Sequence, residues 1–280
     1  MGKVPRVRRR HIPSSWIHVD SNVQTSCAYA TYHWTVNTDL QIVNAINNGL
    51  LEALQSMVKL PTAALQGEFK SQQEILDAAM KVPYFPFLIF QQDIAGMMLT
   101  RFVSNVQQYF VMILAELMRQ HPEAIDPKIV KSVQYSPRDR ETKDQILQSK
   151  LEQWIEQLTY AGFDKLKKKI GQFGLPFEDN TGTFDKIVDE RNIVVHNGWK
   201  VDASFAKKYP QAGLQEGDRL KLNLYDLFDR INPLLFIVAP MDDYVAANFP
   251  LIEKVNLKDH LRELYAERLN SLFQDSMSML

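Results

Sequence analysis

The stretch from Gln91 to Arg119 constrains the fold most strongly, because its apolar side chains recur at the spacing of one helical face. That spacing leaves the polar residues on the opposite face of an amphipathic α-helix. A helix with so long an apolar stripe is stable only when other elements cover it. The stretch therefore predicts the central helix of a helical bundle. Its apolar positions are Ile94, Met98, Val106, Phe110, Ile113 and Leu117.

Shorter helical patterns occupy most of the remaining chain. Prolines and glycines separate them, because proline cannot donate the backbone hydrogen bond of a helix interior and glycine favours turns. The segment from Asn223 to Asp226 resembles a capping box, which marks the start of a helix. The whole pattern predicts an all-α fold. The further helices are expected at residues 41–58, 71–82, 127–134, 147–158, 163–173, 183–197, 223–249 and 256–272.

The first forty residues have a different pattern. Tyr32, Trp34 and Val36 alternate with polar residues, which is typical of a β-strand, and residues 16–19 are expected to pair with them across a turn. This predicts a small N-terminal β-hairpin or an extended arm docked on the helices. The expected organisation is a basic arm with hairpin at 1–40, N-terminal helices at 41–82, a helical domain at 83–250 and a C-terminal helix at 251–280.

The charge balance restricts how the chain can attract nucleic acid. A formal net charge of -1 excludes a uniformly basic binding protein, so any attraction to RNA must come from local clusters. Each cluster is also explained by an ordinary solvated tail or helix face. The clusters are Lys3, Arg6, Arg8, Arg9 and Arg10 in the N-terminal arm, and Lys165, Lys167, Lys168 and Lys169 further on.

Cysteine content and apolar run length indicate the compartment. Cys27 is the only cysteine and cannot form an intramolecular disulfide, as expected in a reducing environment. The basic N-terminus is interrupted at Pro13, before any apolar segment that a signal peptide would need. The longest apolar runs, such as residues 233–241, are shorter than the about 20 residues that span a bilayer. We expect a cytoplasmic protein that does not cross a membrane.

The most distinctive chemistry lies between Glu190 and Gly198. A helix beginning near Thr181 or Thr183 is expected to end there, because Gly198 is the residue type that terminates helices in the left-handed conformation. Arg191, Asn192 and His196 then lie in its last two turns. A guanidinium can stabilise charge on a phosphoryl oxygen, and an imidazole can act as base or acid near neutral pH. The pattern is typical of a site that binds a phosphate and moves its protons.

A plainer interpretation stays open. Asp185, Asp189, Asn192 and His196 can form the solvated face of an amphipathic helix, with the stem of Arg191 lying along the core edge. The spacing alone is weak support, since Arg6 and His11 repeat it in the N-terminal arm. On this interpretation the chain is a helical interaction protein.

Residues 190–197, with the sequence ERNIVVHN, resemble the signature of the HEPN superfamily, the higher eukaryotes and prokaryotes nucleotide-binding domains. The signature is an arginine, a polar residue that is often asparagine, a few further residues and a histidine. The resemblance covers roughly residues 85–250, with a long helix before the motif helix, a glycine turn after the histidine, and an apolar helix that closes the bundle. It implies a HEPN-like helical bundle.

The resemblance also implies a function. HEPN ribonucleases cut single-stranded RNA without a metal, and two domains pair so that both motifs line one cleft. His196 would be the general base or acid, Arg191 would hold the scissile phosphate, and Asn192 would position the phosphate or orient His196. The expected partners are RNA, a second copy of the chain and possible antitoxin or other regulatory proteins, with a toxin or antiviral defence role. The alternative is a non-catalytic HEPN scaffold that dimerises and binds RNA, a nucleotide or a protein.

The remaining site predictions concern substrate binding. Trp199 is expected to stack an unpaired base or to close the edge of the bundle, and Asn105 and Gln108 are expected to face the motif helix. Asn197 and Lys200 complete the predicted substrate-binding set. Residues 199–221 are expected to form a long loop in which 200–202 pair with 220–222. No cofactor and no metal are expected, because the histidines are scattered and no Cys-x-x-Cys occurs.

Overall fold

The fold is described from a computed structural model of the 280-residue chain. The structure describes residues 24–57, 71–82, 90–122, 131, 133, 140–179, 182–264 and 266–267. The basic N-terminal arm, the expected strand at 16–19 and nearly all of the expected helix at 127–134 lie outside these residues.

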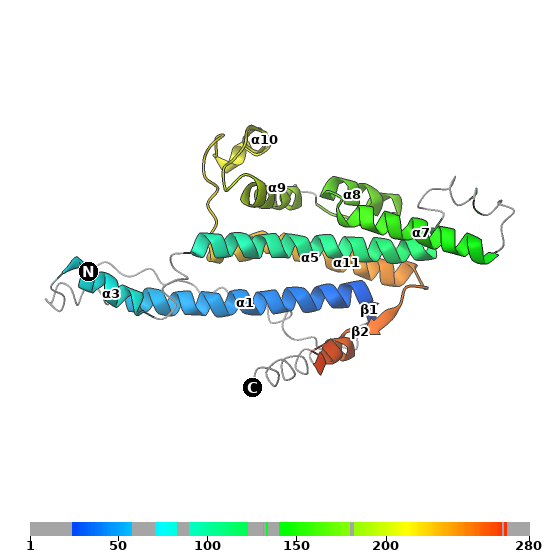
Figure 1. Cartoon of the computed structure of the whole chain (residues 1–280), viewed down its shortest axis with the longest axis horizontal. Helices are drawn as coiled ribbons and strands as arrows, with labels where there is room; N and C mark the ends of the chain where they lie inside the picture. The colour runs from blue at the N-terminus through cyan, green and yellow to red at the C-terminus, as the bar shows by residue number, and fades with distance from the viewer. Residues whose placement is uncertain are drawn as a thin grey trace.

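The central element is α5 (Gln91–Gln120), which contacts helices on several sides. It packs against α1 (Cys27–Met57) and α11 (Leu224–Asn248), and also against α7 (Arg140–Thr159), α8 (Phe163–Gln172) and α9 (Thr183–His196). Figure 1 shows α1 on one side of α5 and the shorter helices α7, α8 and α9 on the other. The all-α class and the central position of the long helix are therefore confirmed. Its apolar stripe is buried because neighbouring helices cover it along its length.

α1 and α5 run antiparallel. The rings of Tyr32 and Tyr109 lie 5.7 Å apart, while Asp39, further along α1, forms an ion pair with Arg101, earlier in α5. The Asp39 carboxylate is buried and also accepts a hydrogen bond from Nδ2 of Asn105 at 2.8 Å. A buried carboxylate is stable only when paired and hydrogen-bonded, so this contact fixes the register of the two helices.

The expected β-strand at residues 32–36 is wrong, because these residues lie inside α1. Their two-residue alternation is short, whereas the apolar spacing of a helical face continues through the following twenty residues. Side chains on that face are buried, and the helical period therefore determines the structure. The buried positions are Tyr32, Val36, Leu40, Val43 and Leu50.

A small two-stranded antiparallel sheet is present elsewhere. It pairs β1 (Gln24–Ser26) with β2 (Lys254–Asn256), and thus joins the start of α1 to the segment that follows α11. Asp242 of α11 secures this junction: it is 3% exposed and accepts hydrogen bonds from the hydroxyls of Thr25 and Ser26. Burial raises the pKa of the Asp242 carboxyl above its usual value, against the opposing effect of these bonds.

One hydrophobic cluster runs through parts of all four predicted segments, with Ile252 as its member in the last. It includes Ala28 to Leu50 of α1, the buried face of α5, and residues of α8, α9 and α11. α1 itself crosses the expected boundary at residue 40 without a break. The N-terminal helix therefore shares its core with the helices that carry the motif. Within the described residues, every helix is too short or too polar to span a bilayer.

The ends of several helices match the expected signals. α3 (Gln72–Met80) begins after Ser71, whose side chain caps it by accepting a hydrogen bond from the backbone of Glu74. α11 begins directly after Asn223 and contains Pro233 and Pro240. At the end of β2, Asn256 Oδ1 accepts a hydrogen bond from the backbone of Asp259 at 3.1 Å, which is the contact of a helix N-cap.

Candidate functional site

The helix that carries the motif, α9, starts and ends close to the expected residues. The N-cap is Gly182, with φ of 65°, and Thr183 is the first helical residue, while Thr181 lies outside the described residues. Asp179 supplies the cap instead, because its carboxylate accepts backbone hydrogen bonds from Phe184 and Asp185 at 3.1 and 3.3 Å. An acidic group is favourable there, since the N-terminus of a helix carries partial positive charge. The sequence signal missed Asp179 because it lies upstream of the helix.

The buried face of α9 includes a charged residue that the sequence pattern did not indicate. Glu190 is 2% exposed and its carboxylate forms an ion pair with Arg230 of α11, while Lys186 lies 4.0 Å away on the same helix. Val195, an apolar residue of the same helix, is instead 45% exposed. The core-facing residues are Phe184, Ile187, Val188, Glu190 and Ile193. The first residue of the ERNIVVHN stretch therefore connects α9 to α11.

Arg191 and Asn192 are in direct contact on the half-buried side of α9. Nη1 of Arg191 donates to Oδ1 of Asn192 at 3.0 Å, and Nε of Arg191 is buried without a hydrogen-bond partner among the described residues. No carboxylate of the described residues lies within ion-pair distance of the guanidinium. Burial lowers the pKa of Arg191 below its usual value. The charge is thus partly desolvated and uncompensated, which is the arrangement that an anion would stabilise.

His196 is the last residue of α9, and its side chain is exposed. The helix ends where expected: the backbone N–H groups of Asn197 and Trp199 both donate to the carbonyl of Ile193 at 3.1 Å, and Gly198 has φ of 55°. Because residues four apart share a helix face, His196 lies one turn beyond Asn192. Arg191, Asn192 and His196 therefore occupy neighbouring positions at one end of the helix.

Trp199 also has a left-handed backbone, with φ of 71°, which is uncommon for a residue other than glycine. Its half-buried indole ring lies against Gly96 of α5, next to Val194 of α9. Of the two roles considered for Trp199, this contact supports closing the bundle edge. No described contact supports base stacking by this ring.

The loop after α9 is more ordered than a long loop. Lys200 pairs with Arg219 in a single antiparallel bridge, slightly displaced from the expected pairing with 220–222, and the side chain of Lys200 is exposed. A short helix, α10 (Ala203–Lys208), follows and is capped by Asp202. Nδ2 of Asn197 donates to Asp202 Oδ2 at 2.8 Å, so Asn197 contacts the start of α10.

Asp189 holds α10 against the motif helix. Its Oδ2 accepts hydrogen bonds from Lys208 Nζ at 2.8 Å and from the hydroxyl of Tyr209 at 2.7 Å. The bond to Asp189 raises the pKa of Lys208, and burial together with the same carboxylate raises the pKa of Tyr209 to about 12. The sequence indicated only a solvated role for Asp189. Its partners come from the loop after α9 and reach it only when that loop folds.

The fold separates the two residues of α5 that were predicted to bind substrate, Asn105 and Gln108. Asn105 is buried and its amide donates to Asp39, so it faces α1 and not the motif helix. Gln108 is exposed and has no described contact with α9. Gln107 instead reaches the α7–α8 connection, where it donates to the carbonyl of Ala161 at 3.1 Å. Substrate binding by Asn105 and Gln108 stays a prediction without a supporting contact.

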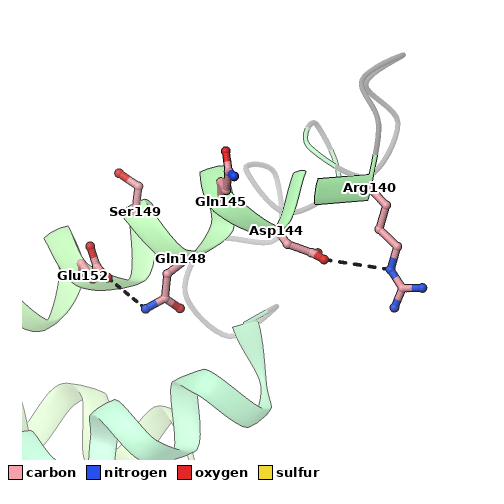
Figure 2. Close-up of a pocket in the computed structure, with 6 residues that line it drawn as sticks. All are labelled: Arg140, Asp144, Gln145, Gln148, Ser149 and Glu152. Carbon is pink, nitrogen blue, oxygen red and sulfur yellow. Dashed lines mark hydrogen bonds and ion pairs between the residues drawn. The ribbon is translucent and has the colours of Figure 1, made fainter. Parts of the chain in front are cut away.

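The motif side chains do not line any of three surface grooves in the described residues. Figure 2 shows one of these, a hollow of about 710 Å³ along the first half of α7. Its residues all come from one helix, where Arg140 lies 4.0 Å from Asp144 and Gln148 donates to Glu152 at 3.0 Å. These exposed contacts satisfy one another, so the hollow contains no convergent chemistry. A second groove of about 270 Å³ lies between residues 176–179 and α11.

Comparison of the chain with protein-family models, with curated proteins and with solved structures gives no match. Among the described residues, no three His, Cys, Asp or Glu side chains are grouped so that they could hold a metal ion. The functional interpretation therefore depends on the motif residues and their surroundings.

Proposed function

We propose that this chain is a HEPN-type endoribonuclease that cleaves single-stranded RNA without a metal, with Arg191, Asn192 and His196 as its catalytic residues. The observation that carries the proposal is the partly buried guanidinium of Arg191, which has no carboxylate partner among the described residues and contacts Asn192, one turn before the exposed imidazole of His196. An unpaired, partly desolvated cation favours an anion such as a phosphodiester.

The three side chains have complementary roles in this reaction. His196 takes the proton from the ribose 2′-hydroxyl, whose oxygen attacks the adjacent phosphorus and displaces the 5′-oxygen of the next nucleotide. A second imidazole, or the same one after protonation, gives a proton to that leaving oxygen. Arg191 neutralises the charge that develops on the phosphoryl oxygens, and Asn192 holds the guanidinium in place through its 3.0 Å contact. The products are a cyclic phosphate end and a free 5′-hydroxyl.

A second copy of the chain would complete the site. His196 lies at an exposed helix end outside the three grooves, so the described residues of one chain do not enclose a substrate there. Beside it, Val195 of α9 is 45% exposed and Met97 of α5 is 68% exposed, each next to the contact between Val194 and Gly96. Exposed apolar side chains of this kind favour association. We propose a homodimer in which two copies of this end of α9 face each other across one cleft.

The alternative proposal is a non-catalytic scaffold of the same family that dimerises and binds RNA, a nucleotide or a protein partner. The exposure of His196, outside the three grooves of the described residues, favours it. The two proposals predict different behaviour of the same variant. His196→Ala abolishes turnover in a ribonuclease, whereas a scaffold shows no turnover before or after the change. For the ribonuclease, the resemblance suggests a toxin or antiviral defence role in the cytoplasm, under a regulatory partner.

The test is cleavage of an unstructured RNA by the purified full chain in excess EDTA. The wild type is expected to release cyclic-phosphate ends, and His196→Ala and Arg191→Gln are expected to leave the RNA intact. His260→Ala is the matched control, because His260 lies beyond β2 and away from the motif. A substrate with one 2′-deoxyribose at the cleaved position should resist cleavage there. Intact RNA with the wild type, or cleavage that survives His196→Ala, refutes the ribonuclease proposal.

A further inference from the structure

The third of the surface grooves, which has a different chemistry, lies between α7 and α8. It has a volume of about 650 Å³ and combines aromatic, amide and basic side chains from both helices. The connection between the helices is short, since α7 ends at Thr159 and α8 begins at Phe163. Its polar and aromatic lining residues are Trp154, Glu156, Gln157, Tyr160, Lys165, Lys168, Lys169 and Gln172.

The lysines of this groove lie on one face of α8. Lys165, Lys168 and Lys169 are separated by three and four residues, which places them along one stripe of a helix. Leu166 and Ile170 form the buried face of the same helix. The fold therefore fixes the basic stripe toward the groove while α8 is anchored in the core by its apolar side.

These lysines differ from their neighbour in the sequence. Lys167 is paired with Asp185 at 2.5 Å and with Asp164 at 3.6 Å. In contrast, no carboxylate of the described residues lies within ion-pair distance of the other three ammonium groups. Burial and the nearby charge of Lys168 lower the pKa of Lys169 below its usual value. The three lysines outnumber Glu156, the one carboxylate that lines the groove, so the groove keeps a net positive charge that an anion would stabilise.

The aromatic side chains add a second kind of recognition. Nζ of Lys169 lies 4.0 Å from the centre of the Trp154 ring, so a cation–π contact holds this ammonium at the groove. Tyr160 is 83% exposed at the end of the groove, an unusual position for so large an aromatic side chain. Exposed aromatic rings beside basic side chains are the combination by which proteins bind single-stranded nucleic acid, because bases stack on the rings and phosphates contact the cations.

We propose that the α7–α8 groove binds a segment of single-stranded RNA outside the cleavage site, with a base stacked on Tyr160 and phosphates held by Lys165 and Lys168. This inference rests on the proposed function, whose substrate it extends. The amides of Gln157 and Gln172 line the same groove and can bond to either donors or acceptors of a base edge. An acidic peptide would use the lysines but would leave the ring of Tyr160 without a role.

The position of the groove separates binding from cleavage. The Lys167–Asp185 ion pair joins α8 to the first turn of α9, whereas His196 is the last residue of that helix. A helix of 14 residues is about 21 Å long, so the groove lies well away from the motif end. RNA held there would extend toward the cleavage site without taking part in the chemistry.

The test is binding of a fluorescent 2′-O-methyl oligoribonucleotide to the full chain, since this probe lacks the attacking hydroxyl and cannot be cut. The double variant Lys165→Gln with Lys168→Gln is expected to weaken binding and to reduce the slope of log affinity against log salt by about 1.4, the value for two phosphate contacts on a single strand. Tyr160→Ala is expected to weaken binding about fivefold or more. All three positions are exposed, so the variants should retain the fold.

The matched control is Lys150→Gln, because Lys150 is an exposed lysine of α7 that does not line the groove. It should bind the probe as the wild type does. Unchanged affinity and salt slope in the double lysine variant overturn the inference, as does binding of poly-glutamate that depends on the lysines while RNA binding does not. Groove-dependent binding without RNA cleavage would refute the ribonuclease proposal alone. Cleavage that depends on His196, with unchanged binding in the groove variants, would refute this inference alone.

Discussion

The indole ring of Trp199 lies so close to Gly96 that a Cβ atom at position 96 would be 2.5 Å from the ring. The absence of a side chain on α5 therefore creates the space into which the residue after the motif helix packs. This contact sets where α9 ends against the central helix, and with it the position of His196. It also explains why a glycine is found within the most strongly helical segment of the chain, where it is otherwise unfavourable.

Gly96→Ala is expected to lower the free energy of unfolding by about 1–3 kcal/mol, because the added methyl group must displace the ring of Trp199. Chemical denaturation of the two proteins measures the change. Gly171→Ala in α8 is the matched control, since nothing lies within 4 Å of its added Cβ. That variant should be more stable by about 0.5–1 kcal/mol, the ordinary preference of a helix for alanine. Equal effects at the two positions would contradict the close contact.

Glu190→Gln is expected to lower the free energy of unfolding by about 2–4 kcal/mol, because it leaves the half-buried guanidinium of Arg230 without its buried carboxylate partner. Asp185→Asn removes a more exposed ion pair, with Lys167, and should cost less than about 1 kcal/mol. Urea titration monitored by circular dichroism gives both values. The double variant Glu190→Leu with Arg230→Leu should lose less stability than the sum of the losses caused by Glu190→Leu and by Arg230→Leu alone. A loss equal to that sum would argue against the ion pair.

His196→Ala and Arg191→Gln are expected to change the free energy of unfolding by no more than about 0.5 kcal/mol, although both abolish cleavage in the proposed function. His196 is exposed, and Arg191 loses no ion pair, because none is formed with the described residues. Thermal melting alongside the RNA assay separates the two effects. A large loss of stability in either variant would mean that the residue supports the fold, and its cleavage result would then carry no information about catalysis.

Asp189→Asn is expected to lower the pKa of Tyr209 from about 12 toward its usual value, because the carboxylate that accepts the phenol hydroxyl is replaced. The absorbance of the phenolate during an alkaline titration measures this. A folded pKa above the unfolded value of about 10 stabilises the protein below pH 10, and the contribution is lost as the pH rises through about 12. The variant should therefore lose less stability over this alkaline range than the wild type. An unchanged titration would show that burial alone raises the pKa.

The buried imidazole of His33 makes the stability of the protein fall as the pH falls, in contrast to Tyr209, which makes it fall as the pH rises. Burial lowers the pKa of this imidazole, which lies 6.1 Å from the ring of Tyr29 in α1. The unfolded chain then takes up a proton below about pH 6.5 while the folded protein does not, so stability falls from that pH toward the lowered value. The wild type should lose more stability between about pH 7.5 and about pH 5.5 than His33→Gln. Equal losses in denaturant titrations at the two pH values would contradict a buried neutral imidazole.

The helices with the longest periodic patterns were predictable. α5 and α9 lie within a residue or two of their expected ranges, and Gly198 ends α9 in the left-handed conformation. The strand expected at 32–36 was a wrong prediction, because its three alternating residues compete with a helical period that continues to Leu50. The actual strands, β1 and β2, are only three residues each and come from distant parts of the chain. Their pairing depends on Asp242, which no local pattern connects to them.

The sequence by itself determined where the chain is helical and that Arg191, Asn192 and His196 share one end of one helix, because both follow from the spacing of neighbouring residues. Only the tertiary structure decided the partner of each polar side chain. It paired Glu190 with Arg230, Asn105 with Asp39 and Asp189 with Tyr209, and it left Arg191 without a carboxylate among the described residues. These contacts join positions far apart in the chain, and burial in a common core, not periodicity, brings them together.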